Sequence, residues 1–298
     1  MTGKQRKPRA LARQCGAAVY HGIERRLPPI PQRYFAYAVH LRRVPNLRNP
    51  RTFNEKISWR MLFDRRDLLA MSCDKIAMKS LAEQRASGLV RVPRVLWSGR
   101  DVGELAETSL PDHWVLKPNH RSGLVHFGHG PANIDRLRVE TRGWVDEVKW
   151  RDGGEWAYSQ ADPVLLVEEL VGAPGSPPLD YKFEVFDGKV QLLIVHLGRF
   201  DDLRGYLFDR NFNAVAAQDA SEVLRESDIV TRPKNFGRMV EVAERIADGY
   251  DYLRVDLYDT GDDVWFGEIT PYEGGGTQRF RPRSFDEFLG SYWTLPTL

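Results

Sequence analysis

Apolar and polar residues alternate along the second half of the chain, which is the pattern of β-strands with one buried face. The stretch 181–186 alternates and meets Asp187-Gly188, a two-residue turn signal, before the apolar run 190–195. Turns of this kind join antiparallel strands. A second alternating stretch with a polar turn at its centre covers 252–269. We therefore predict two antiparallel hairpins.

Other stretches repeat apolar residues every three to four positions, the period of an amphipathic helix. The first follows Thr52, with Glu55 at the capping-box spacing. Further helices are expected from about Asp74 to Ala86 and at roughly 234–248. Three short apolar runs predict additional strands: 95–97, 113–117 and 164–168. Helices first, hairpins later and no internal repeat indicate an α+β fold.

The character of the sequence changes near residue 50. Residues 1–50 are basic, contain scattered aromatic residues and are broken by prolines, so we expect a basic helical N-terminal extension outside the main body. Residues 51–115 are expected to form a helical N-terminal part of that body. Residues 116–298 are expected to form its core, and two lobes are the default for a chain of this length.

Composition is that of a globular protein, with 42% hydrophobic and 28% charged residues among 298. Lys and Arg number 43 against 41 Asp and Glu, so no uniform positive field favours nucleic acid. Positive charge gathers in residues 1–9 and at Arg25, Arg26, Arg42 and Arg43. A solvated terminus explains these runs, and contact with RNA, an anionic membrane surface or a protein complex is the alternative.

Cysteines and long apolar runs are scarce. Cys15 and Cys73 show no pairing pattern, so neither a disulfide framework nor structural zinc is expected. There is no apolar run of about 18 residues, and no apolar signal-peptide core follows the basic N-terminus. We expect a cytoplasmic protein without a transmembrane segment.

Three charged residues interrupt the apolar pattern of the last hairpin. Arg254 and Asp256 project from one face of a strand, and Glu268 lies on the partner strand after the turn. Two carboxylates buried close together need a cation, and hard oxygen donors beside a phosphate are the usual protein contribution to a magnesium site. Alternatively, Arg254 only pairs with these acids on a solvated sheet face.

Two lysines stand where phosphate could be held. Lys75 opens the second helix, and Lys117 ends a strand before the turn 118–123. Such a turn can offer backbone amides and polar side chains to phosphate oxygens. Lys79, one helical turn beyond Lys75, is expected to be ordinary surface. Each lysine taken alone also fits an unremarkable helix start or strand end.

The apolar strand 164–167 runs into two acids and two further apolar residues: Glu168, Glu169, Leu170 and Val171. The backbone of such a segment can read an adenine edge while aliphatic side chains sandwich the ring. Any strand that meets a loop has the same shape, so this signal alone decides nothing.

Taken together, these features occur in the order and approximate spacing of one fold. The chain resembles the ATP-grasp enzymes, and within them the TupA-like branch of teichuronopeptide biosynthesis. The resemblance covers about residues 50–290 and rests on Arg51-Thr-Phe-Asn-Glu-Lys-Ile-Ser-Trp59, Asp74-Lys75, Trp114-Val-Leu-Lys-Pro-Asn-His120, Asp180-Tyr-Lys-Phe183, Arg254-Val-Asp-Leu-Tyr258 and Phe266-Gly-Glu-Ile-Thr270. It implies an ATP-grasp fold, with the nucleotide between two α+β lobes and a helical N-terminal extension.

The resemblance also implies roles for individual residues. The residues implied to bind the nucleotide are Lys75, Lys117, His120, Ser122, Glu168, Glu169, Leu170, Val171, Asp180 and Lys182. Asp256 and Glu268 are implied to bind Mg²⁺, with Arg254 and Lys117 as catalytic cations beside the transferred phosphoryl group. Many ATP-grasp ligases have an Asn where this chain has Thr270, a poorer metal ligand. Acceptor recognition is assigned to Glu273, Gly274, Gly275 and Arg279, with Arg281 and Arg283 nearby.

The implied activity is ATP- and magnesium-dependent joining of a carboxylate and an amine through an acyl phosphate. The substrates would be small molecules, glycans or peptides of cell-surface polysaccharide, peptidopolysaccharide or natural-product biosynthesis. The three arginines after residue 276 suit an anionic acceptor, or form a solvated basic surface. Two other functions stay open: a kinase or glycan-modifying transferase using the same cleft, and a non-catalytic ATP-binding scaffold of polysaccharide assembly.

Overall fold

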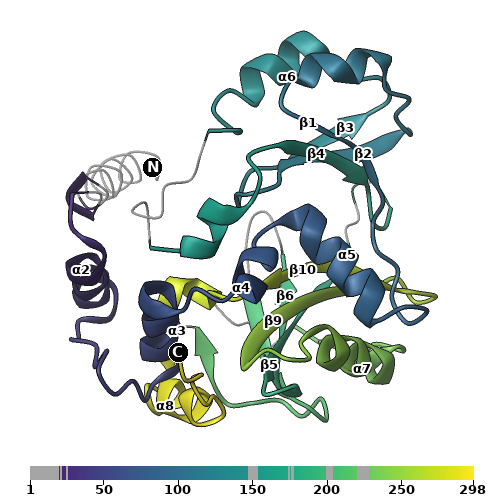
Figure 1. Cartoon of the computed structure of the whole chain (residues 1–298). Coiled ribbons are helices and arrows are strands. Elements are labelled where there is room, and N and C mark those ends of the chain that lie inside the picture. Colours follow the sequence, from purple (N-terminus) through teal and green to yellow (C-terminus); the bar gives the residue numbers. More distant parts are fainter. Residues whose placement is uncertain are drawn as a thin grey trace, which may run out of the picture.

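The computed structural model describes residues 20, 22–24, 26–146, 154–173, 175, 178–198, 204–219 and 228–298. Two β-sheets form the cores of the two lobes seen in Figure 1. The smaller sheet has the strand order β1-β4-β2-β3 and the larger β10-β9-β5-β6-β7. Neighbouring strands in both sheets run antiparallel. Helices with antiparallel sheets make the fold α+β, as predicted.

The smaller lobe is built on short strands that bury Trp114. Its elements are β1 (Val95–Gly99), the 3-10 helix η1 (Val102–Glu107), β2 (His113–Pro118), β3 (His126–His129), α6 (Ile134–Glu140) and β4 (Leu165–Glu169). The 3-10 helix η2 (Trp156–Gln160) comes between α6 and β4 in sequence, but its Ala157 is buried in the core of the larger lobe. Trp114 is 2% exposed and lies against Gly128 of the neighbouring strand. A Cβ at Gly128 would lie 2.1 Å from the Trp114 ring, so this position requires glycine.

The larger lobe carries both hairpins that the alternation predicts. Its strands are β5 (Asp180–Phe186), β6 (Lys189–Leu197), β7 (Arg204–Asp209), β9 (Tyr252–Asp259) and β10 (Val264–Thr270). Asp187 and Gly188 have φ of 45° and 72°, the positive values that a two-residue hairpin turn needs. Two short strands, β8 (Gln218–Asp219) and β11 (Phe280–Arg281), pair beside this sheet.

The two faces of the larger sheet differ sharply in polarity. Phe183 and Val255 lie on one face and belong to a core shared with α5 (Lys75–Arg85) and α7 (Phe236–Ile246). On the opposite face, Lys182 pairs across the strands with Asp256, and Glu184 pairs with Arg254. Side chains alternate between the two faces of a strand. Because the apolar residues point toward these helices, the charged residues between them point to the opposite face of the sheet.

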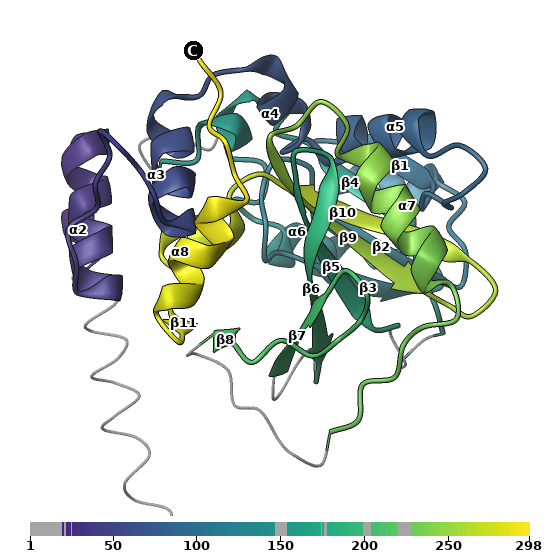
Figure 2. The ribbon, with the colours of Figure 1, turned by 90° about the horizontal axis from the view of Figure 1, so that it is seen from below.

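Several helices lie beside the larger lobe: α2 (Pro29–Leu41), α3 (Phe53–Phe63), α4 (Asp67–Met71) and α8 (Ser284–Ser291). Figure 2 shows α2 outside α3. The start of α3 is the capping box expected from sequence, since the Thr52 side chain accepts from Glu55 N and the Glu55 carboxylate accepts from Thr52 N. The helix α2 lies in the N-terminal extension, whose first 19 residues fall outside the described part.

The boundaries drawn from sequence stay predictions. Residue 116 falls inside β2, and the smaller sheet begins earlier, at Val95. Among the described residues, no helix has the length and apolarity to cross a membrane. Cys73 is buried with a free thiol whose pKa is raised by burial, and Cys15 lies outside the described residues.

Candidate active site

A cavity of about 310 Å³ lies between the two sheets. One wall comes from β2, β4 and the loop 121–125, and the other from β5, β9 and β10, with Lys75 at the start of α5. Nearly all of the residues implied to bind nucleotide or metal line it: Lys75, Lys117, Ser122, Glu168, Glu169, Leu170, Val171, Asp180, Lys182, Asp256 and Glu268. His120 and Arg254 are the exceptions.

Lys75 is positioned by the first turn of α5. The Asp74 side chain accepts hydrogen bonds from the backbone of Ile76 and Ala77, at 3.0 and 2.9 Å, and so caps the helix. Lys75 Nζ donates to the carbonyl oxygens of Asn119, at 3.3 Å, and Arg121, at 2.5 Å. Burial lowers the Lys75 pKa to about 8. Its partners are thus carbonyl groups, and a bound anion would favour its charged form.

Lys117 shares a carboxylate with a second lysine. Glu168 of β4 pairs through Oε1 with Lys117 Nζ at 2.5 Å and through Oε2 with Lys79 Nζ at 2.8 Å. Burial alone would raise the Glu168 pKa, but the two ammonium groups lower it. The Glu168 side chain is therefore committed to lysines, which leaves its main chain as the part that could meet an adenine ring.

The expectation that Lys79 is ordinary surface was wrong. Its side chain is 7% exposed, and Nζ also donates to the Pro93 carbonyl at 2.9 Å. Lys79 lies one helical turn from Lys75, and this face of α5 is covered by protein. The sequence analysis missed this residue, although its spacing of four residues from Lys75 places both lysines on one face of the helix.

His120 lies behind the phosphate-side loop. It is 1% exposed, and Nε2 is 2.8 Å from the Asp146 carbonyl oxygen. Burial lowers its pKa. Because a neutral imidazole donates from one nitrogen, the ring is suited to hold the loop, while Ser122 and Gly123 line the cavity itself.

Asp256 is the most enclosed acid of the opposite wall. It is 2% exposed and accepts from Arg254 at 2.7 and 2.8 Å and from Lys182 at 2.5 Å. Burial alone would raise the Asp256 pKa, but Arg254 and Lys182 lower it. Lys182 also pairs with Asp180 at 3.0 Å, and its own pKa is raised by Asp256 despite burial. Asp256 is therefore ionised at neutral pH.

Glu268 faces Asp256 from the neighbouring strand. The register pairs the two residues, and an irregularity between Phe266 and Glu268 precedes them. A Cβ at Gly267 would lie 2.9 Å from the Asp256 carbonyl oxygen, so the irregular position favours glycine. The Glu268 side chain is 42% exposed and accepts from Arg254 at 3.0 Å. This carboxylate is open to the cavity, whereas Asp256 is enclosed.

This donor set suits Mg²⁺. No group of three or more His, Cys, Asp or Glu that could hold a metal is found in the described part of the chain. Magnesium is bound by one or two protein carboxylates, with phosphate oxygens and waters completing six ligands. Asp256 and Glu268 provide that number beside a basic wall that could hold phosphate. Thr270 lies opposite Arg254 in the register.

Arg254 connects this cavity to a second one. Besides Asp256 and Glu268, its guanidinium donates to Glu273 of the 3-10 helix η3 (Glu273–Gly276). Arg254 lies behind the two acids rather than in the cavity lining. Three carboxylates around this buried guanidinium keep it charged, and they raise its pKa although burial opposes this.

The residues assigned to acceptor recognition lie in two adjoining hollows of the surface. Glu273 lines the second cavity, whereas Arg279 lines a groove of about 370 Å³ with Arg42, Arg43, Arg281 and Arg283. Gly274 and Gly275 have φ of 56° and 55°, and the Gly275 carbonyl accepts from Arg33 at 2.6 Å. Glu273, Gly274 and Gly275 are thus neighbours in η3, and Arg279 lies in the adjacent groove, which shares Gln278 and Phe280 with the second cavity.

Comparison with known proteins gives one family match. The model described as TupA-like ATPgrasp matches residues 55–294. No curated protein matches the chain.

Three solved structures resemble the fold at low identity. They are D-alanine--D-alanine ligase from Bacillus anthracis complexed with ATP (14% identity, 68% of this chain and 55% of that chain, TM-score 0.39), D-alanine-D-alanine ligase from Helicobacter pylori (13%, 76% and 62%, 0.41), and the ATP-grasp ligase PsnB complexed with minimal precursor, Mg and ADP (13%, 69% and 52%, 0.35). The chain spans less than two thirds of the length of each. These likenesses are too distant to assign an activity.

Proposed function

This chain belongs to the TupA-like ATP-grasp family, and we propose that it is an ATP- and magnesium-dependent ligase that joins a carboxylate to an amine. The observation that carries the proposal is the polarity of the cavity between the sheets. Lys117 lies on the smaller-sheet wall, Asp256 and Glu268 lie on the larger-sheet wall, and Lys75 extends from the start of α5 to the loop after β2. A polyphosphate would meet cations on one side and a carboxylate-bound divalent cation on the other.

The nucleotide is proposed to lie along this cavity. Its phosphates would contact Lys75, Lys117 and the loop at Ser122. Its adenine would meet the segment 168–171, with Leu170 and Val171 against the ring and the main chain against its edge. Asp180 and Lys182 line the same cavity from β5. His120 and Glu169 would act indirectly, since His120 binds the Asp146 carbonyl and Glu169 accepts from Arg94 N at 2.9 Å.

The metal proposal assigns Mg²⁺ to Asp256 and Glu268. When bound, the ion would neutralise charge on the transferred phosphate. Lys182 and Arg254 keep Asp256 ionised, and Arg254 fixes the separation of the two acids by donating to both. A cation held in this way needs no reorganisation during the reaction.

The proposed chemistry needs no protein nucleophile. An oxygen of the substrate carboxylate attacks the γ-phosphorus, the bond to the β-phosphate oxygen breaks, and ADP leaves. The neutral amine nitrogen then attacks the acyl carbon and loses one proton to solvent, the bond to the phosphate oxygen breaks, and inorganic phosphate leaves with an amide formed. Cys73 is unsuited to a nucleophilic role, because it is fully buried and its pKa is raised.

The setting that we propose is cell-surface polysaccharide, peptidopolysaccharide or natural-product biosynthesis. The resemblance in sequence to the teichuronopeptide branch suggests it, and the arginine groove supports it, because its five guanidinium side chains suit an anionic glycan or peptide carboxylate.

The proposal is tested in two stages. ATP, ADP and a non-hydrolysable analogue, each with Mg²⁺, should raise the melting temperature, because a ligand that binds only the folded state stabilises it. A panel of carboxylates with ATP and hydroxylamine should then give ADP and a hydroxamate detected by mass. No melting shift with any nucleotide would overturn nucleotide binding, and a phosphorylated alcohol without hydroxamate would indicate a kinase.

A further inference from the structure

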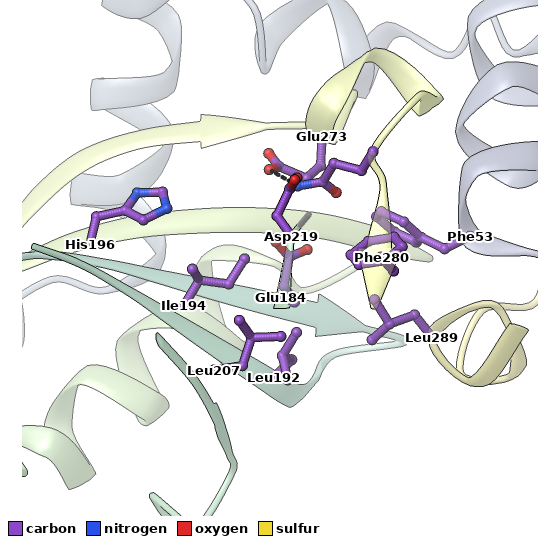
Figure 3. Close-up of a pocket in the computed structure, with 11 residues that line it drawn as sticks. Phe53, Glu184, Leu192, Ile194, His196, Leu207, Asp219, Glu273, Phe280 and Leu289 are labelled. Atoms are coloured by element: carbon purple, nitrogen blue, oxygen red, sulfur yellow. Dashed lines mark hydrogen bonds between the residues drawn. The ribbon is translucent and has the colours of Figure 1, made fainter. Parts of the chain in front are cut away.

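A second cavity of about 150 Å³ lies on the same polar sheet face as the first. Figure 3 shows Glu184 and Glu273 in the middle of its lining, with His196 toward one end and Phe53, Phe280 and Leu289 toward the other. Arg254 links the two cavities, because its guanidinium binds Asp256 and Glu268 on one side and Glu273 on the other.

One buried acid in this cavity has an oxygen that the protein leaves unbonded. Glu184 is 2% exposed, and its Oε2 accepts from the Tyr252 hydroxyl at 2.6 Å. Its Oε1 is buried without a hydrogen-bond partner in the described part of the chain. Leaving a buried polar atom unsatisfied costs about 1–3 kcal/mol, so such atoms in native proteins need an explanation.

The charge of the lining indicates what the missing partner is. Three carboxyl side chains face this cavity, those of Glu184, Asp219 and Glu273, and no Lys or Arg is among the lining residues that the structure describes, although Arg254 donates to Glu273 from beside it. Only a donor can complete Glu184 if that acid is ionised, and a cationic donor also suits the neighbouring acids. A carboxylate ligand would instead place another acid beside these three.

The rest of the lining is apolar and limits the size of the occupant. Ile194 and Leu207 lie on one side of the acids, and Phe280 and Leu289 on the other. A cavity of about this volume takes up a single benzene ring in a well-studied engineered protein. The site therefore fits a short chain or one ring that carries an amino group.

We propose that this second cavity is the binding site of the amine substrate, with the ammonium group held by Glu184 and Glu273 and an apolar body against Phe280 and Ile194. The identification of the occupant as a substrate rests on the proposed ligase function. The position fits that role, because Arg254 binds Glu273 of this cavity and also binds both carboxylates assigned to magnesium, so the two cavities are adjacent. Burial and the nearby Glu273 charge raise the Glu184 pKa to about 8, and an ammonium group at Oε1 would oppose that shift.

The test uses benzylamine as the probe, titrated into the full chain without nucleotide and followed by ligand-detected NMR. Benzyl alcohol and benzoate keep the ring and change the charge. We expect benzylamine to bind wild type at least tenfold more tightly than either. Glu184→Gln keeps the shape of the side chain and should weaken benzylamine at least tenfold. Glu287→Gln is the matched control, because it removes an exposed carboxylate from α8, the helix that contributes Leu289 to the lining.

Two results would overturn the inference: equal benzylamine affinity in wild type and Glu184→Gln, or no saturable binding to wild type. If Glu184→Gln does not fold, Asp219→Asn on the short strand β8 is the second variant to measure, and it should lower the affinity for benzylamine severalfold. Melting shifts with ATP and Mg²⁺ on the same samples separate the two proposals. A retained nucleotide shift with unchanged benzylamine binding refutes the amine site alone, whereas a missing nucleotide shift refutes the ligase.

Discussion

Both walls of the cavity between the sheets contain buried carboxylates, but the two walls differ in the balance of acids and cations. On the smaller-sheet side, a single buried acid, Glu168, pairs with two lysines. On the larger-sheet side, Asp256 pairs with two cations, but the neighbouring Glu268 is 42% exposed on its side chain. The first wall has a surplus of cations and the second a surplus of acids.

This difference shows which part of a ligand each wall can hold. Phosphate oxygens suit the wall with spare ammonium groups, and the acidic wall repels them unless a divalent cation intervenes. Acids also gather beyond Arg254 in the second cavity, where Glu184 pairs with no Lys or Arg among the described residues. Along the polar face of the larger sheet, the carboxylates proposed to bind Mg²⁺ are thus followed by those proposed to bind the amine.

The largest effect is expected from breaking the enclosed part of the acidic wall. Asp256→Asn leaves Lys182 and Arg254 without their main partner, and removing one member of a buried ion pair costs about 3–5 kcal/mol. The loss is expected to be this large because Asp256 is only 2% exposed. Urea unfolding of wild type and variant measures the loss, and an unchanged free energy of unfolding would contradict the ion-pair account.

The next effect concerns the basic wall. Lys117→Met should weaken ATP binding about tenfold, since a hydrogen bond to a charged group contributes about 1.5–3 kcal/mol. Lys79→Met should affect ATP less and stability more, because Lys79 is enclosed between Glu168 and the Pro93 carbonyl. Calorimetric titration with ATP and Mg²⁺ measures the difference, with the exposed Lys234→Ala as control. Equal ATP losses for Lys79 and Lys117 would mean that the phosphates lie elsewhere.

A smaller effect follows from the Lys75 pKa of about 8 in the free protein. Bound phosphate favours the charged amine, so its pKa rises on binding. ATP affinity should therefore fall as pH rises above 8, by at most tenfold per pH unit. Lys75→Arg stays charged and should flatten this part of the profile. Affinity measured from pH 7 to 9 gives the result, and identical slopes in both proteins would remove Lys75 from the phosphate site.

The smallest effect tests the scaffold. Thr52→Ala removes the capping interaction with Glu55 N, at 3.2 Å, and should cost about 1 kcal/mol. Thermal melting measures it, and nucleotide affinity should stay at the wild-type value because α3 does not line the cavity between the sheets. If the variant is fully folded and still binds ATP more weakly than wild type, α3 shapes the nucleotide site.

Local patterns in the sequence predicted the elements well, because each depends on neighbours in the chain. The capping box at Thr52, the turn at Asp187-Gly188 and the alternation around Asp256 are all of this kind. The gathering of Lys75, Lys117 and Asp256 followed only from the family resemblance, since these residues are far apart in sequence.

The features that sequence reasoning missed depend on contacts between distant segments. Lys79 is covered by Glu168 and Pro93, and His120 by the segment at Asp146. Glu184 lies two residues after Lys182 on the same strand face, but nothing local in the sequence shows that one of its oxygens is buried without a partner among the described residues. Burial and pairing of charges are properties of the assembled lobes.

The most direct test of the nucleotide site compares ATP affinity across a magnesium titration in wild type and Glu268→Gln. This carboxylate is partly exposed, so the variant should keep wild-type melting without ligand. Magnesium should strengthen ATP binding to wild type, and Glu268→Gln should lose most of that gain. The same magnesium response in both proteins would contradict the proposed metal site and, with it, the account of the acidic wall.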